Sequence, residues 1–197
     1  MGAGVDATRV GKKRRGPDPC WQEIGEKDYP SFIAENAGCV IGGTAWDFAN
    51  DGRVPRRSLD LLAIEEAGQF SLANTIAVSQ AAVNLLLLGD PQQLPQVTQG
   101  THPEPVDRSA LGWLTDGHDT LPDDLGYFLA RSWRMHPALC AAVSQLSYDG
   151  RLTSVDAAAE RSLDGSDPGV RCERVEHTGN AVSSVEEGDA VVQRARY

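Results

Sequence analysis

The chain has 197 residues, of which 41% are hydrophobic and 23% charged, a balance typical of globular domains that excludes a wholly disordered or fibrous protein. Its formal net charge of −10 is uneven, because residues 1–20 sum to +3, residues 21–154 to −9 and residues 155–197 to −4, so that most of the chain repels free nucleic acid. No apolar run approaches the roughly 18 residues that cross a bilayer, and no apolar stretch follows the basic N-terminus. We therefore expect a cytoplasmic protein without membrane contact.

Residues 1–20 are basic and rich in glycine, and we expect them to be a flexible lead-in without a packed element. Two short apolar stretches follow, at 39–41 and 59–64, and both have the character of buried strands. Apolar residues then recur at helical spacing over 70–82, behind Ser71 as a possible N-cap. A third apolar run covers 83–88. Short apolar strands that alternate with helical segments predict an α/β fold with a parallel sheet and helices on its faces.

The second half of the chain begins after a long irregular connection, residues 98–124, which we expect to separate two folding units. A helix opened by Pro137 follows, then a polar linker over 153–169, then a last helix that the capping box Ser184-Val185-Glu186-Glu187 announces. We accordingly divide the chain into the lead-in (1–20), a first domain (21–126) and a second domain (127–197).

An acidic pair, Glu65-Glu66, ends the second apolar run and has the form of the second nucleotide-binding motif of P-loop ATPases. At the carboxyl end of a buried strand, one carboxylate can hold the Mg²⁺ of a nucleotide, usually through water, while the next orients the attacking water. Acidic doublets are common at strand ends, so the pair by itself is a weak signal.

The third apolar run ends in Gly89-Asp90-Pro91-Gln92-Gln93, which brings an acidic side chain and two amides to the same edge of the predicted sheet. A side-chain amide can hydrogen-bond a phosphate oxygen without adding charge, and so can report whether the γ-phosphate is present. A plain turn with solvated glutamines is the alternative. The acidic pair upstream favours a nucleotide site.

Together these segments resemble the motifs of superfamily 1 helicases. Residues 65–69 (EEAGQ) are similar to motif II, residues 89–95 (GDPQQLP) to motif III, and residues 132–137 (SWRMHP) with 148–152 (YDGRL) to motif IV. The aromatic-Arg-Met-His-Pro form points to the 5′ to 3′ branch, which includes the nonsense-decay and Okazaki-processing helicases. Residues 42–50 (GGTAWDFAN) resemble most closely the segment before motif II in bacterial proteins that fuse a RecB-like nuclease to such a helicase. The resemblance covers residues 38–192 and implies RecA-like domains.

The resemblance implies roles for the matching residues of the nucleotide site, with ATP and Mg²⁺ as cofactors. Glu65 matches the Mg²⁺ ligand, Glu66 the carboxylate that activates water, and Gln93 the γ-phosphate sensor. Asp90 and Gln69 match positions that support nucleotide binding.

Three further residues are implied in catalysis or nucleic-acid binding. Arg134 matches an arginine finger that stabilises the transferring phosphate; the alternative is that it pairs with a surface acid. Gly43 and Thr44 match a segment that contacts single-stranded nucleic acid, with DNA expected rather than RNA; alternatively, Thr44 only ends a strand. We expect Trp46 and Trp113 to be packed against the protein; the alternative is a platform on which a base stacks.

Two departures from the family limit the expected activity. Glu65 stands where the family has Asp, and one additional methylene can displace the metal enough to cost about 10²-fold in rate. The phosphate-binding loop G-x-x-x-x-G-K-[ST] does not occur in the sequence, and the nearest similar stretch, Gly4 to Lys13, has six residues between its glycines and lacks the hydroxyl.

We therefore expect an internal fragment of an ATP-dependent DNA helicase: the later part of a first RecA-like domain and the start of a second, inactive by itself. Its partners would be single-stranded DNA, and a nuclease domain or the remaining helicase segments. The alternatives are a non-enzymatic remnant and a module that binds nucleic acid or protein.

Overall fold

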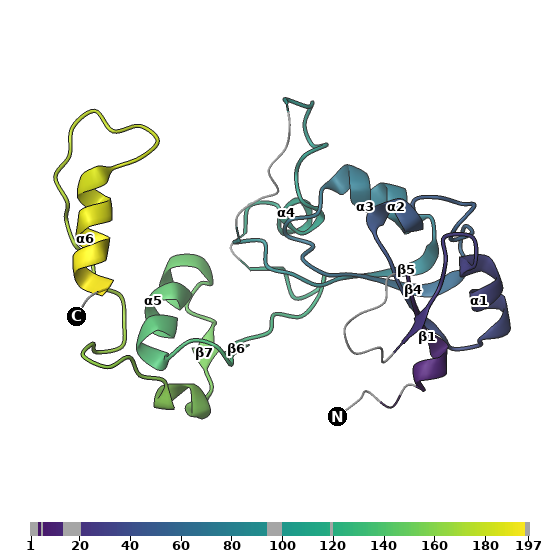
Figure 1. Ribbon diagram of the computed structural model, residues 1–197, viewed down its shortest axis with the longest axis horizontal. Coiled ribbons are helices and arrows are strands. Elements are labelled where there is room, and N and C mark those ends of the chain that lie inside the picture. The colour runs from purple at the N-terminus through teal and green to yellow at the C-terminus, as the bar shows by residue number, and fades with distance from the viewer. Residues whose placement is uncertain (1–3, 5, 14–20, 94–99, 119, 196–197) are drawn as a thin grey trace. The chain divides into compact units, whose positions relative to one another are not determined.

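The structure is a computed structural model that describes residues 4, 6–13, 21–93, 100–118 and 120–195. The chain divides into unit 1 (Met1–Leu125) and unit 2 (Gly126–Tyr197). Helices alternate with short strands in both units (Figure 1), and all the named strand pairs are parallel. The expected α/β class is thus confirmed. Within the described residues, no helix is both long enough and apolar enough to span a membrane.

The first sheet of unit 1 has the order β2-β1-β3, with bounds Gln22–Glu23 (β2), Val10–Lys12 (β1) and Val40–Gly42 (β3). Its central strand β1 lies in the segment expected to hold no packed element, so that expectation is wrong at Val10–Lys12; residues 14–20 lie outside the described part of the chain. Gly11 is buried, and a Cβ there would come within 2.8 Å of the Phe32 ring. The absence of a side chain therefore lets β1 lie directly against helix α1 (Tyr29–Glu35).

The second sheet of unit 1 pairs β4 (Leu59–Ile64) with β5 (Ala82–Leu87), in the register Leu62 with Leu85 and Ile64 with Leu87. Both strands were expected, and both are confirmed. The expectation of one continuous sheet is wrong for the described strands, because no ladder joins β3 to β4. Thr44 follows β3 of the first sheet, whereas Glu66 and Gln93 follow the two strands of the second sheet. These residues therefore do not lie at the edge of one shared sheet.

Helix α3 (Leu72–Ser79) connects β4 to β5, and the Ser71 hydroxyl caps it by accepting the N–H of Asn74 at 3.2 Å. This cap was expected. Helix α4 (Ala110–Thr115), in contrast, lies inside the predicted irregular connection. Ser109 caps it in the same way, accepting the N–H of Gly112 at 2.9 Å, so a local polar cap is enough to start a helix among many turn residues.

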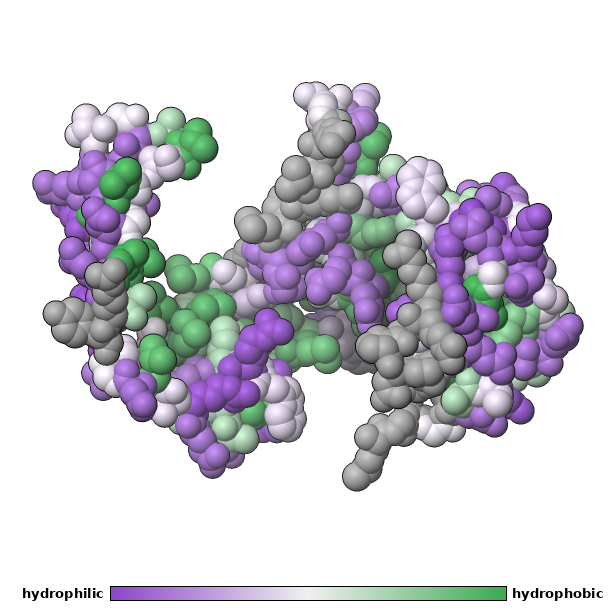
Figure 2. Space-filling view, viewed as in Figure 1, coloured by the Kyte–Doolittle hydropathy of each residue, from purple (hydrophilic) through white to green (hydrophobic). Residues whose placement is uncertain are grey.

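One hydrophobic core joins both sheets of unit 1. It includes Tyr29, Phe32, Leu62, Ile64 and Leu111, all exposed by 7% or less. Apolar side chains also reach the surface (Figure 2), several of them on the second sheet. Those exposed between 41% and 53% are Leu61, Val83, Leu85 and Leu86 on the two strands, and Leu88 directly after β5.

Unit 2 is smaller. Its strands β6 (Arg131–Ser132) and β7 (Thr153–Ser154) pair in parallel, and helix α5 (Pro137–Ser147) connects them. The expected start of α5 at Pro137 is confirmed. Helix α6 (Val185–Ala195) begins at the predicted capping box, where the N–H of Glu187 donates to the Ser184 hydroxyl at 3.2 Å.

Candidate active site

The acidic pair lies on the tight turn that follows β4. Glu65 and Glu66 are both exposed, and Glu66 has a φ of 54°, in the left-handed region that costs a non-glycine residue roughly 1 kcal/mol. The N–H of Gln69 donates to the carbonyl of Glu66 at 2.8 Å and closes the turn. The turn therefore holds both carboxylates open to solvent at the carboxyl end of the strand.

The turn after β5 is organised by Asp90. One oxygen of its carboxylate accepts the backbone N–H of Gln92 at 3.0 Å, and the other accepts the side-chain Nε2 of Gln93 at 3.4 Å. Gln93 itself is exposed. Asp90 thus acts within its own turn, where it orients the amide that we predicted to sense the γ-phosphate.

These two turns contact each other through their backbones. The N–H of Ala67 donates to the carbonyl of Leu88 at 2.9 Å. A Cβ on Gly68 would lie 2.1 Å from the carbonyl oxygen of Asp90, and a Cβ on Gly89 would lie 2.7 Å from the nitrogen of Ala67. Only glycine fits at either position. The structure therefore brings the predicted motif II and motif III turns together at one end of the β4–β5 sheet.

The other predicted contact segment, Gly43-Thr44, is an exposed turn between β3 and the short helix α2 (Ala45–Phe48). Thr44 is the N-cap of this helix. Its backbone N–H and its hydroxyl both donate to one carboxylate oxygen of Asp47, at 2.9 and 2.7 Å. The two hydrogen-bond donors of Thr44 are therefore used inside the protein.

Asp47 is the centre of a charged network that the sequence analysis missed. Its side chain is fully buried, and its second oxygen accepts from Arg53 at 2.6 Å and from Lys13 at 3.3 Å. Glu26 pairs with the same two cations, at 2.6 Å from Lys13, so the four charges balance. Burial by itself raises the pKa of Asp47, but the hydrogen bonds from Thr44, Arg53 and Lys13 outweigh it and lower the pKa to about 2.

A sequence signal for part of this network exists. The spacing Thr44-x-x-Asp47 is that of a capping box, which predicts a helix start and a reciprocal bond between the two residues. Lys13 and Arg53 lie 34 and 6 residues from Asp47, and no local pattern pairs them with it.

The expectation that Trp46 and Trp113 are packed is wrong. The side chain of Trp46 is 82% exposed and that of Trp113 is 49% exposed. In α2, Ala45 and Phe48 face the core, which is the spacing of one helix face, and Trp46 therefore points away from it.

Arg134 lies in unit 2, on the bend between β6 and α5. It is exposed, and its backbone N–H donates to the Ser132 hydroxyl at 3.4 Å. Its guanidinium forms no ion pair with any residue that the structure describes. His136 is the N-cap of α5, where its Nδ1 accepts the N–H of Ala138 at 3.1 Å.

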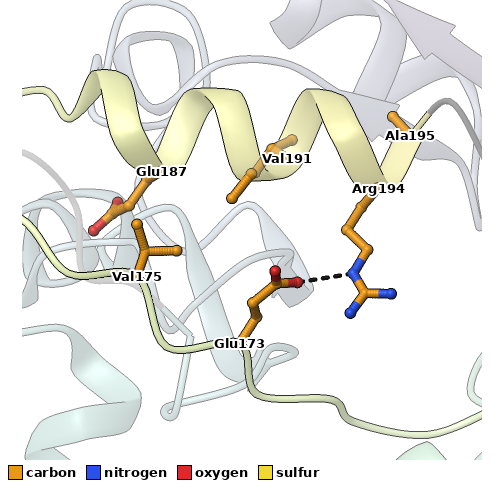
Figure 3. A pocket seen from close by; sticks show the side chains of 7 residues that line it. Glu173, Val175, Glu187, Val191, Arg194 and Ala195 are labelled. Carbon is orange, nitrogen blue, oxygen red and sulfur yellow. Dashed lines mark hydrogen bonds and ion pairs between the residues drawn. The ribbon is translucent and has the colours of Figure 1, made fainter.

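No group of three or more His, Cys, Asp or Glu side chains in the described part of the chain could hold a metal ion. A hollow of about 520 Å³ lies in unit 2 (Figure 3), between α6 and the segment before it. The ion pair between Glu173 and Arg194, 2.8 Å apart, crosses it, and Val175 and Val191 line it. None of the predicted site residues lines this hollow.

Comparison with protein-family models and with curated proteins gives no match to this sequence.

Proposed function

We propose that this chain is part of an ATP-dependent DNA helicase of superfamily 1, 5′ to 3′ branch. Unit 1 would be the later part of a first RecA-like domain, and unit 2 the beginning of a second. The observation that supports this most directly is the backbone contact between the turns after β4 and β5, through Gly68 and Gly89. It is the arrangement that two motifs acting on one nucleotide require.

The residues of these turns fit the chemistry of ATP hydrolysis. Carboxylate oxygens are the ligands that Mg²⁺ prefers, and a single carboxylate suffices when water and nucleotide phosphates complete the shell. We assign this role to Glu65. Glu66 would orient the attacking water, and the Gln93 amide, held by Asp90, would donate a hydrogen bond to a phosphate oxygen. The role predicted for Arg134 stays a prediction.

The sequence offers no replacement for the phosphate-binding loop. Gly11-Lys12, the stretch most similar to such a loop, belongs to the ladder of β1, where both residues pair with β2 and β3. Their backbone N–H groups are therefore not arranged as an anion cradle. We expect this chain by itself to bind ATP weakly and to show no DNA-stimulated turnover.

A titration of the chain with a fluorescent ATP analogue, with and without Mg²⁺, tests the proposal. We expect weak binding of the ATP analogue, and we expect Mg²⁺ to strengthen it. Glu65→Gln and Gln93→Ala should each weaken this binding by about tenfold, which is the effect of losing one charge-assisted hydrogen bond or metal contact. Glu35→Gln, an exposed acid on α1, is the matched control and should change nothing. Binding that neither substitution affects would instead favour a non-enzymatic remnant or a binding module.

A further inference from the structure

Trp46 is the most exposed tryptophan among those that the structure describes, at 82%, against 71% for Trp133 and 49% for Trp113. A tryptophan side chain carries a large apolar surface and is usually covered for most of its area. Its ring makes no aromatic or cation–π contact with the described residues. An uncovered indole in a protein that otherwise buries a core is a candidate contact for a ligand.

The backbone that carries Trp46 is held from both sides. Ala45 and Phe48 anchor α2 to the hydrophobic core, and Asp47 anchors it to the charged network through Thr44, Arg53 and Lys13. The backbone at Trp46 is therefore fixed before any ligand arrives, which lowers the part of the entropic cost of binding that comes from ordering the chain.

The chemistry around Trp46 favours a nucleobase as the occupant. Thr44 has both of its donors committed to Asp47, so it has none left for a phosphate oxygen. Gly43, which precedes Thr44, is exposed, but a Cβ there would lie 3.0 Å from the Tyr29 hydroxyl and 3.2 Å from Asp47, so the chain before α2 packs closely on the protein. The flat, uncovered face of the Trp46 indole suits a base that stacks, and stacking accepts any base.

Charge also distinguishes this place from the rest of the acidic chain. The two acids of the network, Asp47 and Glu26, are balanced by Lys13 and Arg53, whose side chains are 29% and 24% exposed. A polyanion that approaches Trp46 therefore meets a cluster of zero net charge, in which Glu26 is 47% exposed and both cations are ion-paired, although the chain carries a net charge of −10.

We propose that Trp46 is a stacking platform for one base of single-stranded DNA, and that Thr44 is a positioning residue that holds α2 rather than a contact to the DNA backbone. This inference rests on the proposed function, and it names the group of unit 1 that touches the nucleic acid.

Two oligonucleotides with the same number of phosphates test it: a 15-mer of thymidine and a 15-mer of abasic sites. Binding to the 197-residue chain is measured by fluorescence anisotropy at low salt. We expect Trp46→Ala to weaken binding of the thymidine oligonucleotide by about tenfold, as base stacking predicts, and to leave binding of the abasic one unchanged. Trp113→Ala is the matched control in the same unit and should change neither.

Tryptophan emission gives a second readout. Unlabelled thymidine oligonucleotide should quench the emission of the unmodified chain, and Trp46→Phe should remove that quenching. Salt should affect the unmodified chain and Trp46→Ala with the same slope, because no phosphate contact is lost.

The outcomes separate this inference from the proposed function. If the chain binds the thymidine oligonucleotide and Trp46→Ala binds it equally well, the inference is wrong and the proposed DNA binding stands. If neither oligonucleotide binds at low salt, the inference and the DNA-binding part of the proposed function are both wrong.

Discussion

Replacing Asp47 by Asn removes one charge from the buried network and keeps the shape of the side chain. The amide places an –NH₂ group where a carboxylate oxygen now accepts hydrogen bonds from Arg53 or from Thr44. The N–H or O–H group of Arg53 or Thr44 then faces the –NH₂ group of the asparagine, which is also a donor. Lys13 and Arg53 also lose a counter-charge and keep only Glu26.

The structure sets the size of this effect. A pKa of about 2 for Asp47, against an ordinary value of 3.8, corresponds to roughly 2.4 kcal/mol of stability at neutral pH. The donor left without an acceptor adds about 1 kcal/mol. Lys13 and Arg53 are partly exposed and can recover some hydration, so we expect Asp47→Asn to lower the free energy of unfolding by about 3 kcal/mol rather than the larger cost of a fully buried pair.

Urea unfolding followed by tryptophan emission measures this change. In a Trp133→Phe background the remaining tryptophans, Trp21, Trp46 and Trp113, all belong to unit 1, so the signal reports the unit that contains Asp47. Because the pKa is lowered on folding, the contribution of Asp47 is complete above about pH 5 and is lost as the pH falls through 3.8 towards 2. The gap between the two proteins should therefore narrow by about 2 kcal/mol over that range.

Asp51→Asn is the matched control, because Asp51 pairs with Arg56 at 2.6 Å with both side chains more than half exposed. We expect a change below about 1 kcal/mol for it. Equal free energies of unfolding for Asp47→Asn and the unmodified protein at pH 7, or a gap that does not change with pH, would refute the reasoning.

Three further substitutions have defined outcomes in urea unfolding. Gly68→Ala should cost about 2 kcal/mol or more, since its Cβ would lie 2.1 Å from the Asp90 carbonyl; unchanged stability would show that the two turns are not in contact. Glu66→Gly should raise the free energy of unfolding by up to about 1 kcal/mol by relieving a φ of 54°, and a loss would contradict the strain. Ser144→Ala should cost about 1 to 2 kcal/mol, because the buried hydroxyl accepts the N–H of Leu152 at 3.0 Å; a neutral result in far-UV circular dichroism would contradict this role.

The longer elements of unit 1 could be predicted from the sequence. Strands β4 and β5 have six residues each and are apolar except for Asp60 and Asn84. Helix α3 has a capping serine, and its apolar residues recur at helical spacing. Such signals are local, and a short window of sequence contains all of them.

Strand β1 and helix α2 could not be predicted in this way. β1 has three residues, and its place in the sheet depends on Gly11, which fits beneath Phe32 from helix α1. α2 has four residues and depends on the bonds between Thr44 and Asp47. A partner from another element determines β1, and a local capping pair starts α2; hydrophobic periodicity contains neither signal.

In the candidate site, too, features that depend on local sequence could be predicted and features that depend on distant neighbours could not. The two turns that carry Glu66 and Gln93 were expected at one edge, and the structure brings them into contact, since each turn directly follows a strand of one parallel pair. The exposure of Trp46 and the charges around Asp47 depend on which neighbours each residue meets in three dimensions.

The sheet β4–β5 has a practical consequence for solution behaviour. Leu85 and Leu86 are neighbours on β5, point to opposite faces and are each more than 40% exposed. Among the described strands, β5 pairs with β4 alone, so one edge of its backbone can accept a further strand. An apolar strand with an open edge is a template for pairing between molecules. We therefore expect solubility to limit the protein concentration that the measurements above can use.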